Sequence, residues 1–289
     1  MAMGDQIRPD FFAAPAATRF TRDEMPVVKR INYYARVDSD LSSGKTAASE
    51  ATQGGSHGRA AGVVLASGSG SRMGAEVNKV YLPLAGRSLV SWSVAALAAV
   101  PDIEFLVLVA RPSDAEHVAN VLSAHSGPRL DVVAGGATRQ ESELMALRHL
   151  SERIGTGEID VVLIHDAARP LVSPALVADV LRAAREYGGA IPGLARDDLV
   201  EVGDDGTGVA GPAPGRVVAV QTPQGFRAAP LLAAYEQAAL DGFDGTDTAS
   251  CIAEYTDIAV RCIEGDERNL KITYPHDLPL AEGVLATAD

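Results

Sequence analysis

The chain has 289 residues, of which 47% are hydrophobic and 22% are charged, and its formal net charge at pH 7 is −13. This length suffices to bury a full hydrophobic core in one or two domains. The acidic balance argues against a nucleic-acid-binding protein, which would carry a basic face, and no apolar stretch approaches the roughly 20 residues that span a bilayer.

Residues 1–59 are expected to form a mostly disordered extension, because the part from about Asp38 to Arg59 is rich in small and polar residues. The extension lacks a basic start followed by an uninterrupted apolar core, which is the pattern of a secretory segment. Cys251 and Cys262 lie among apolar residues, which favours two small core residues over a disulfide or a metal pair. We therefore expect a cytoplasmic protein.

The rest of the chain, residues 60–289, is predicted to be one domain in which apolar strands alternate with amphipathic helices. The predicted strands are Gly62–Ala66, Phe105–Ala110, Leu130–Val133, Asp160–Ile164, Gly189–Pro192 and Ile258–Ile263. The predicted helices are Ser88–Ala99, Asp114–His125, Arg139–Arg153, Pro174–Tyr187 and Ala228–Ala239. This alternation indicates an α/β fold with a Rossmann-like, mostly parallel sheet, helices on both faces, and ligands bound beyond the carboxyl ends of the strands.

The segment 193–215 interrupts this alternation. It is rich in Asp, Gly and Pro, weakly apolar, and too long for a simple loop in a compact domain. An extended hairpin arm, a lid or disorder would each account for it. We favour an arm or a lid, spanning about residues 193–220.

The loop after the first predicted strand is suited to holding a polyphosphate. Its Gly and Ser residues, from Gly68 on, let backbone N–H groups turn toward an anion, and Arg72 and Lys79 add positive charge. Two common phosphate motifs do not fit, because Gly74 comes one residue late for a dinucleotide fingerprint and no Gly-Lys-Ser/Thr follows. The alternative is a flexible surface loop with incidental charge. The spaced Arg and Lys favour the phosphate site, since Lys79 and Lys271 are the only lysines after Ala60.

A second motif, His165-Asp-Ala-Ala-Arg-Pro170, ends a predicted buried strand. Asp166 at the strand tip is well placed to hold Mg²⁺, which prefers carboxylates shared with phosphate oxygens. Taken alone, Asp166 fits a helix or turn cap better. Arg169 can pair with a phosphate of a second substrate, whereas His165 is expected to be structural because Mg²⁺ disfavours imidazole.

Three further segments carry polar groups at the boundaries of predicted elements. In Gly135–Ser142, Gly136 and Ser142 could approach a base edge, or the segment could be an ordinary turn capped by Thr138. Gln221–Phe226 contains Thr222, and Thr246 with Asp247 is typical of a helix N-cap. Lys271 is predicted to lie on a short strand, where it could be functional or simply face water.

Together these segments resemble the cytidylyltransferases of the isoprenoid precursor pathway, the non-mevalonate (MEP) pathway. These enzymes make 4-diphosphocytidyl-2-C-methyl-D-erythritol from CTP and 2-C-methyl-D-erythritol 4-phosphate. The resemblance runs from about Ala60 to Leu285, and the motifs occur in the family's order. It implies a transferase with the nucleotidyltransferase fold, CTP and a polyol phosphate as substrates, Mg²⁺ as cofactor, and a homodimer built through the protruding arm.

The resemblance also assigns roles to individual residues. Those that would surround the nucleotide are Ala66, Ser67, Gly68, Ser69, Gly70, Gly136, Ser142, Asp166 and Ala167. Arg72, Lys79 and Lys271 would be catalytic, and Asp166 would bind Mg²⁺. The phosphate of the acceptor would be positioned by Arg169, Thr222 and Lys271.

The chain departs from the family pattern in places. The family usually has Ala where Ser67 stands and Pro where Asn78 stands. In the arm, the family's Asp-Thr-x-Lys motif is replaced by Asp197-Asp-Leu-Val200. The position of the family's arm arginine is occupied by Pro214, and Arg216 follows two residues later. Because these arm positions contact the polyol phosphate, a cytidylyltransferase for another polyol phosphate, such as ribitol 5-phosphate, is an alternative. A non-catalytic nucleotide-binding homologue is a second one.

Overall fold

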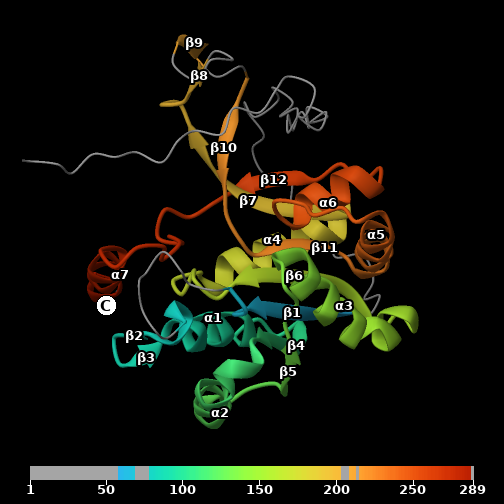
Figure 1. Ribbon diagram of the computed structural model, residues 1–289, viewed down its shortest axis with the longest axis vertical. Helices are drawn as coiled ribbons and strands as arrows, with labels where there is room; N and C mark the ends of the chain where they lie inside the picture. The colour runs from blue at the N-terminus through green and yellow to red at the C-terminus, as the bar shows by residue number, and fades with distance from the viewer. Residues whose placement is uncertain (1–57, 69–77, 203–207, 213–214, 288–289) are drawn as a thin grey trace, which may run out of the picture. The chain divides into compact units, whose positions relative to one another are not determined.

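A mixed β-sheet forms the centre of the computed structural model, which describes residues 58–68, 78–202, 208–212 and 215–287 (Figure 1). Among these residues the sheet has eight strands in the order β10-β7-β11-β6-β1-β4-β5, with β12 paired to β7. The strands of this sheet are β1 (Arg59–Leu65), β4 (Ile103–Ala110), β5 (Leu130–Ala134), β6 (Ile159–Asp166), β7 (Gly189–Arg196), β10 (Val217–Val220), β11 (Gln224–Arg227) and β12 (Arg261–Glu264). A two-stranded sheet of β2 (Pro83–Leu84) and β3 (Arg87–Ser88) lies between β1 and the first α-helix in the sequence.

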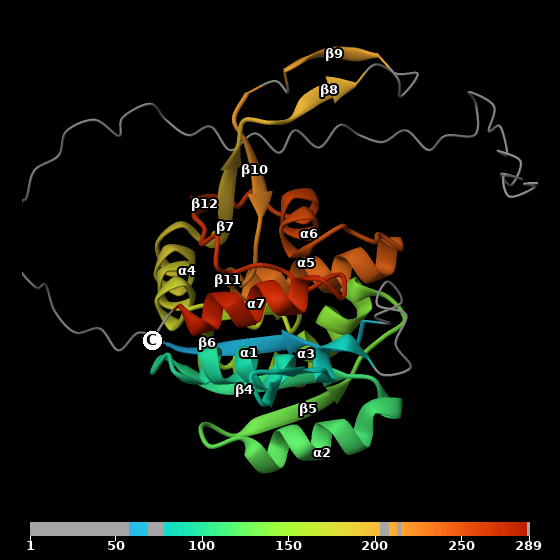
Figure 2. The ribbon, with the colours of Figure 1, turned by 90° about the vertical axis from the view of Figure 1, so that its left-hand side faces the viewer.

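Helices cover both faces of this sheet (Figures 1 and 2). They are α1 (Leu89–Ala98), α2 (Ala115–Ala124), α3 (Arg139–Gly155), α4 (Pro174–Tyr187), α5 (Ala228–Asp241), α6 (Thr248–Tyr255) and α7 (Asp277–Ala286). Successive strand residues point to opposite faces, so neighbours on β1 enter different cores. Val64 packs with the buried residues of α1, α2 and α4, whereas Val63 packs with those of α3, α5 and α6. The predicted α/β class with helices on both faces is confirmed.

The four strands that run side by side from β6 to β5 are parallel, as the continuous apolar runs predict. Val63 of β1 pairs with Ile164 of β6 on one side and with Val107 of β4 on the other. Beyond β6, the short strand β11 inserts antiparallel between β6 and β7. The carboxyl ends of β1 and β6 therefore lie next to each other at one edge of the sheet.

The structure corrects two expectations about secondary structure. Lys271 does not lie on a strand: residues 269–273 form irregular backbone, in which the Ile272 N–H donates to the Ala168 carbonyl at 2.8 Å. The last strand of the sheet begins at Arg261 rather than at Ile258. An apolar run suggested a strand from Ile258, and alternating apolar residues suggested one at Lys271, but only backbone pairing with a neighbour creates a strand.

The segment that interrupts the alternation folds into paired strands (Figure 2). β7 continues past the sheet edge to Arg196, and β10 runs antiparallel to it, with Val217 opposite Arg196 and Val220 opposite Gly193. Farther out, β8 (Val200–Val202) pairs with β9 (Val209–Pro212). We call residues 193–220 the arm.

The expected disordered extension, residues 1–59, falls almost entirely outside the described residues. All described residues belong to one compact unit, Ala35–Asp289. Within the described ranges, no helix is both long enough and apolar enough to cross a membrane.

Candidate active site

A cavity of about 510 Å³ opens where β1 and β6 end, bordered by Leu65 of β1 and Asp166 of β6. Its described lining contains one carboxylate, that of Asp166, and four cationic side chains, those of Lys79, Arg111, Arg139 and Lys271. We call this cavity the carboxyl-end pocket. An excess of cations in a protein of net charge −13 indicates a site for an anion.

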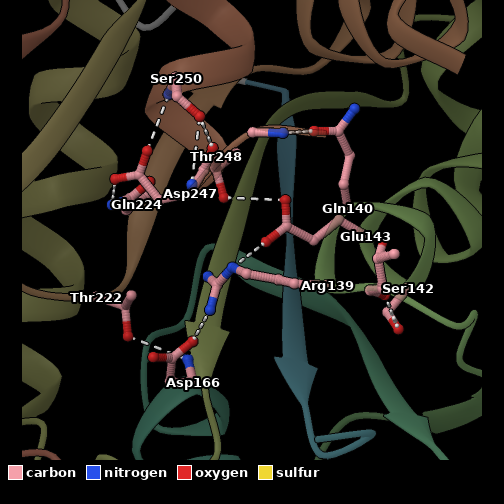
Figure 3. Close-up of polar contacts among 12 residues, drawn as sticks. Arg139, Gln140, Ser142, Glu143, Asp166, Thr222, Gln224, Asp247, Thr248 and Ser250 are labelled. Atoms are coloured by element: carbon pink, nitrogen blue, oxygen red, sulfur yellow. Dashed lines mark hydrogen bonds and ion pairs between the residues drawn. The ribbon is translucent and has the colours of Figure 1, made fainter. Parts of the chain in front are cut away.

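Asp166 is the centre of charge in this pocket (Figure 3). One carboxylate oxygen lies 2.5 Å from Nη1 of Arg139, and the other lies 2.6 Å from Nζ of Lys271. Burial alone would raise the pKa of Asp166, but the cations Arg139 and Lys271 hold it well below its ordinary value. Asp166 is therefore an anion with one cationic partner from α3 and another from the segment that follows β12.

Lys79 reaches the pocket from a short 3₁₀-helix, Lys79–Tyr81, whose position is fixed by Asn78. The buried Nδ2 of Asn78 donates to the Ala66 carbonyl at 2.7 Å and to Asp114 at 3.2 Å. Asp114 is held in turn by Arg111 through two hydrogen bonds of 3.0 and 2.9 Å. The amide thus ties the start of the Lys79 segment to the end of β1.

Hydroxyl groups line the side of the pocket formed by the segment 135–142. Ser67 donates to Ser142 at 2.8 Å, and Ser142 donates to the Thr138 carbonyl at 2.9 Å while it accepts from the Gly136 N–H at 3.1 Å. Thr138 caps α3 by accepting from the Glu141 N–H at 3.1 Å. A Cβ at position 135 would lie 2.5 Å from the Cβ of Ser67, so the close contact between these two segments requires glycine at position 135.

The residues expected to bind the nucleotide are mostly found at this pocket. Ser67, Gly68, Gly136, Ser142 and Asp166 line it, as do the expected catalytic residues Lys79 and Lys271. Ala66 and Ala167 are buried beside it, and the Ala167 N–H donates to the Leu65 carbonyl at 3.1 Å. Ser69, Gly70 and Arg72 lie outside the described residues, so their roles stay predictions.

The two other residues expected to bind the acceptor, Thr222 and Arg169, do not line the pocket. Thr222 is buried, and its hydroxyl accepts from the Asp166 N–H at 3.0 Å and contacts Nδ1 of His165 at 3.1 Å. The Arg169 guanidinium donates to the carbonyls of Asn269 and Val220 at 2.8 and 3.2 Å. Arg169 thus secures backbone around the site in this structure, and its contact with a phosphate stays a prediction.

His165 is structural in its contacts. Its ring is fully buried, with Nδ1 at Thr222 and Nε2 at 3.1 Å from the Arg169 carbonyl. Burial lowers the pKa of His165 to about 4, so the ring is neutral at pH 7. Both ring nitrogens are engaged within the protein, and the expectation that His165 does not bind Mg²⁺ stays a prediction.

Arg139 and Glu143 have no role among the sequence predictions, but the structure places Arg139 beside Asp166 and Glu143 beside Arg139 (Figure 3). Nε of Arg139 forms a 2.8 Å ion pair with Glu143, one turn later on α3. Buried Glu143 also accepts hydrogen bonds from Tyr235 on α5 and, at 3.2 Å, from Thr248 on α6. The spacing of an Arg and a Glu four residues apart on a predicted helix was visible in the sequence, but the partners on α5 and α6 were not.

The carboxylate of Asp166 fits a magnesium ion that arrives with a nucleotide. Among the described residues, no cluster of three or more His, Cys, Asp or Glu side chains could enclose a metal. Mg²⁺ at nucleotide sites needs fewer protein ligands, because one or two carboxylates hold it together with phosphate oxygens and water. An ionised carboxylate at the floor of a cationic pocket supplies that donor.

The fold and the pocket define the class of the protein: an α/β protein with an anion site at the carboxyl ends of its parallel strands. The chain belongs to the 2-C-methyl-D-erythritol 4-phosphate cytidylyltransferase family, whose model matches residues 60–287. The 2-C-methyl-D-erythritol 4-phosphate cytidylyltransferase of Synechococcus sp. is 37% identical over 228 residues, which cover 77% of this chain and 95% of the relative. That of Thermobifida fusca is 38% identical over 242 residues, covering 79% and 94%.

Solved structures show the same relationship. The 4-diphosphocytidyl-2C-methyl-D-erythritol synthase of Anaerococcus prevotii superposes with a TM-score of 0.69 at 26% identity, covering 80% of this chain and 97% of that one. The 2-C-methyl-D-erythritol 4-phosphate cytidylyltransferase of Thermus thermophilus superposes with a TM-score of 0.57 at 31% identity, covering 78% and 98%. The resemblance found in the sequence motifs is thereby confirmed.

Proposed function

We propose that this protein transfers a cytidylyl group from CTP to 2-C-methyl-D-erythritol 4-phosphate, giving 4-diphosphocytidyl-2-C-methyl-D-erythritol and pyrophosphate. This is the reaction named for its family and relatives. The observation that carries the proposal is the carboxyl-end pocket, where Lys271 and Arg139 pair with Asp166 and Lys79 lines the same cavity at the tips of the parallel strands. This is the place where α/β sheets bind nucleotides.

In the proposed reaction, an oxygen of the acceptor phosphate attacks the α-phosphorus of CTP. A new P–O bond forms, the bond from the α-phosphorus to the bridging oxygen breaks, and pyrophosphate leaves. The attacking phosphate is already ionised at neutral pH, so no general base is required. The protein must align two anions and offset their charge, and Lys79 and Arg72 would do so at the triphosphate.

Asp166 would hold Mg²⁺ against the triphosphate oxygens. When bound, the ion would offset negative charge on the phosphates. Lys271 is 41% exposed and lies on irregular backbone, so its ammonium group can leave Asp166 for a substrate phosphate. Exchange of an intramolecular ion pair for a phosphate contact would expose the carboxylate as the nucleotide binds.

The cytidine would lie on the side of the pocket lined by Ser67, Gly68, Gly136 and Ser142. Backbone groups next to glycine can approach a planar base closely, and the hydroxyl of Ser142 is held in place by the Thr138 carbonyl and the Gly136 N–H. Ala66, Ser69, Gly70 and Ala167 would complete the surroundings of the nucleotide.

The acceptor would be held by Lys271, Thr222 and Arg169 at one end and by the arm at the other. In the arm, the guanidinium of Arg196 donates to both carboxylate oxygens of Asp198, at 2.7 and 2.5 Å. Asp198 stands where the family has threonine, so the arm offers a different surface to the polyol. This observation favours ribitol 5-phosphate or another polyol phosphate as the second candidate acceptor.

The arm would also build a homodimer. Its outer strand exposes Val200 and Val202, which are 52% and 48% accessible in the single chain. Sedimentation of the purified protein tests this proposal, with a dimer expected and a monomer at micromolar concentration contradicting it. We further propose that the enzyme works in the cytoplasm.

Release of pyrophosphate from CTP tests the proposed function. We expect release with 2-C-methyl-D-erythritol 4-phosphate and Mg²⁺, and none when either is left out. Release only with ribitol 5-phosphate would establish the second candidate. A protein that binds CTP but releases no pyrophosphate with any polyol phosphate would be a non-catalytic homologue.

A further inference from the structure

We propose that Glu143 is a positioning residue, which holds Arg139 and offsets its charge so that Asp166 can attract a divalent cation delivered with the nucleotide. The inference rests on the proposed function, because it concerns the same pocket. Glu143 itself does not line the pocket, so it would touch neither the nucleotide nor the metal.

Arg139 stands between two carboxylates (Figure 3). Its Nη1 lies 2.5 Å from Asp166, and its Nε lies 2.8 Å from Glu143. A planar guanidinium can serve two carboxylates at once, which a lysine cannot do in this geometry. The position of Glu143 therefore determines which edge of Arg139 faces Asp166.

Glu143 is itself firmly anchored. Its side chain is 1% exposed, and one oxygen accepts hydrogen bonds from the hydroxyl groups of Tyr235 and Thr248. Tyr235 and Thr248 are buried on α5 and α6, so three helices converge on this carboxylate. A buried charged group without such partners would be strongly disfavoured, and the convergence of donors offsets that cost.

The charges around Asp166 balance in this arrangement. Burial raises the pKa of Glu143, and the guanidinium of Arg139 together with the hydroxyl groups of Tyr235 and Thr248 acts against that rise. With Glu143 ionised, Asp166 and Glu143 carry two negative charges, and Arg139 and Lys271 carry two positive charges. If Glu143 were neutral, the group would carry a net positive charge and would repel a further cation. At a dielectric constant of about 80, as in water, one unit charge about 6–8 Å from a divalent cation changes its affinity by about five- to tenfold.

The variant Glu143→Gln tests this inference, since it removes the charge and keeps the shape of the side chain. We expect Mn²⁺, measured by electron paramagnetic resonance in the presence of CTP, to bind the variant about five- to tenfold more weakly than the wild type. CTP measured in EDTA should bind equally well or more tightly, because the pocket becomes more positive. A merely structural defect would weaken both ligands.

Glu236→Gln is the matched control. Glu236 pairs with Arg148 at 2.6 Å between the same two helices, α3 and α5, but both side chains are more than 40% exposed. This variant should bind Mn²⁺ and CTP as the wild type does. Equal Mn²⁺ affinity in Glu143→Gln and Glu236→Gln would overturn the inference.

Tyr235→Phe provides a second test if Glu143→Gln does not fold. It keeps the charge of Glu143 and removes one of its anchoring donors. We expect about a twofold loss of Mn²⁺ affinity with CTP bound, and unchanged affinity would contradict the proposal. A wild type that binds Mn²⁺ and CTP but transfers no cytidylyl group would refute the proposed function, while the Mn²⁺ comparison would still decide the role of Glu143.

Discussion

Two cavities lie at opposite ends of the same parallel strands, and they differ in charge more than in size. The carboxyl-end pocket, of about 510 Å³, has four cationic side chains and one carboxylate in its described lining. The cavity at the amino end of β6, of about 870 Å³, has three cationic side chains and three carboxylates in its described lining: Arg182, Arg185 and Arg227 against Asp102, Asp160 and Glu186. We call this larger cavity the amino-end pocket.

Both aspartates of the amino-end pocket pair with the same arginine. Arg185 forms ion pairs with Asp160, at 2.8 Å, and with Asp102, and it donates to the Gly58 carbonyl at 2.6 Å. In the carboxyl-end pocket the cations in the described lining outnumber the carboxylates there, because Asp114 and Glu143, which pair with Arg111 and Arg139, do not line the cavity. The comparison indicates that an excess of cations at the cavity surface, rather than cavity volume, marks the site for an anionic substrate.

Loss of a cation should therefore lower kcat at the carboxyl-end pocket and leave kcat unchanged at the amino-end pocket. Lys79→Ala should lower kcat about 10²–10³-fold, because one preorganised charge at the transferring phosphate is lost. Its thermal unfolding should stay close to that of the wild type. Arg182→Ala, at the amino-end pocket, should leave kcat unchanged, and equal effects of the two variants would remove the distinction between the pockets.

Asp166→Asn should lower kcat by about 10²-fold and should also change the response to acid. The pKa of Asp166 is lowered in the folded protein, so its ionised form contributes stability that is present above its ordinary pKa of about 4 and is lost as the pH falls below it. The difference in melting temperature between wild type and variant should shrink between pH 5 and pH 3. A constant difference over this range would contradict the charge assigned to Asp166.

Asn78→Ala should have an intermediate effect. It removes the donor that ties the Lys79 segment to the Ala66 carbonyl and to Asp114. We expect about a tenfold loss of kcat and a stability loss of about 1–2 kcal/mol, since two buried acceptors lose a partner. Steady-state kinetics and denaturant unfolding measure the two effects, and wild-type kcat would show that Asn78 does not position Lys79.

Arg185→Ala should affect stability alone. Its side chain is 16% exposed and joins residues that precede β1 and β4 to the start of β6. We expect a loss of about 1–3 kcal/mol in the free energy of unfolding. Values of kcat and KM should not change, and a drop in kcat would connect the amino-end pocket to catalysis.

The sequence predicted the framework of the fold because each parallel strand is a continuous apolar run. β11 was missed, since Gln224-Gly-Phe-Arg227 contains one large apolar residue and takes its place through pairing with both β6 and β7. The strand predicted at Lys271 was wrong because the backbone there bonds to Ala168 instead of a strand. Local patterns carry no information on such pairing.

The same limit applies to the site. Lys79, Asp166 and Lys271 could be singled out because each has an unusual type or place in the sequence. Asn78 with Asp114, and Glu143 with Tyr235, could not, because they meet across 36 and 92 residues of chain. Side chains that hold a site in position depend on tertiary contacts, which only the fold reveals.

The most direct test is to identify the product formed from CTP and 2-C-methyl-D-erythritol 4-phosphate by phosphorus NMR. We predict two coupled diphosphate resonances of 4-diphosphocytidyl-2-C-methyl-D-erythritol, together with an equal amount of pyrophosphate, and their loss in Lys79→Ala. Unchanged CTP in the presence of Mg²⁺, acceptor and folded protein would contradict the assignment of the carboxyl-end pocket as the site of cytidylyl transfer.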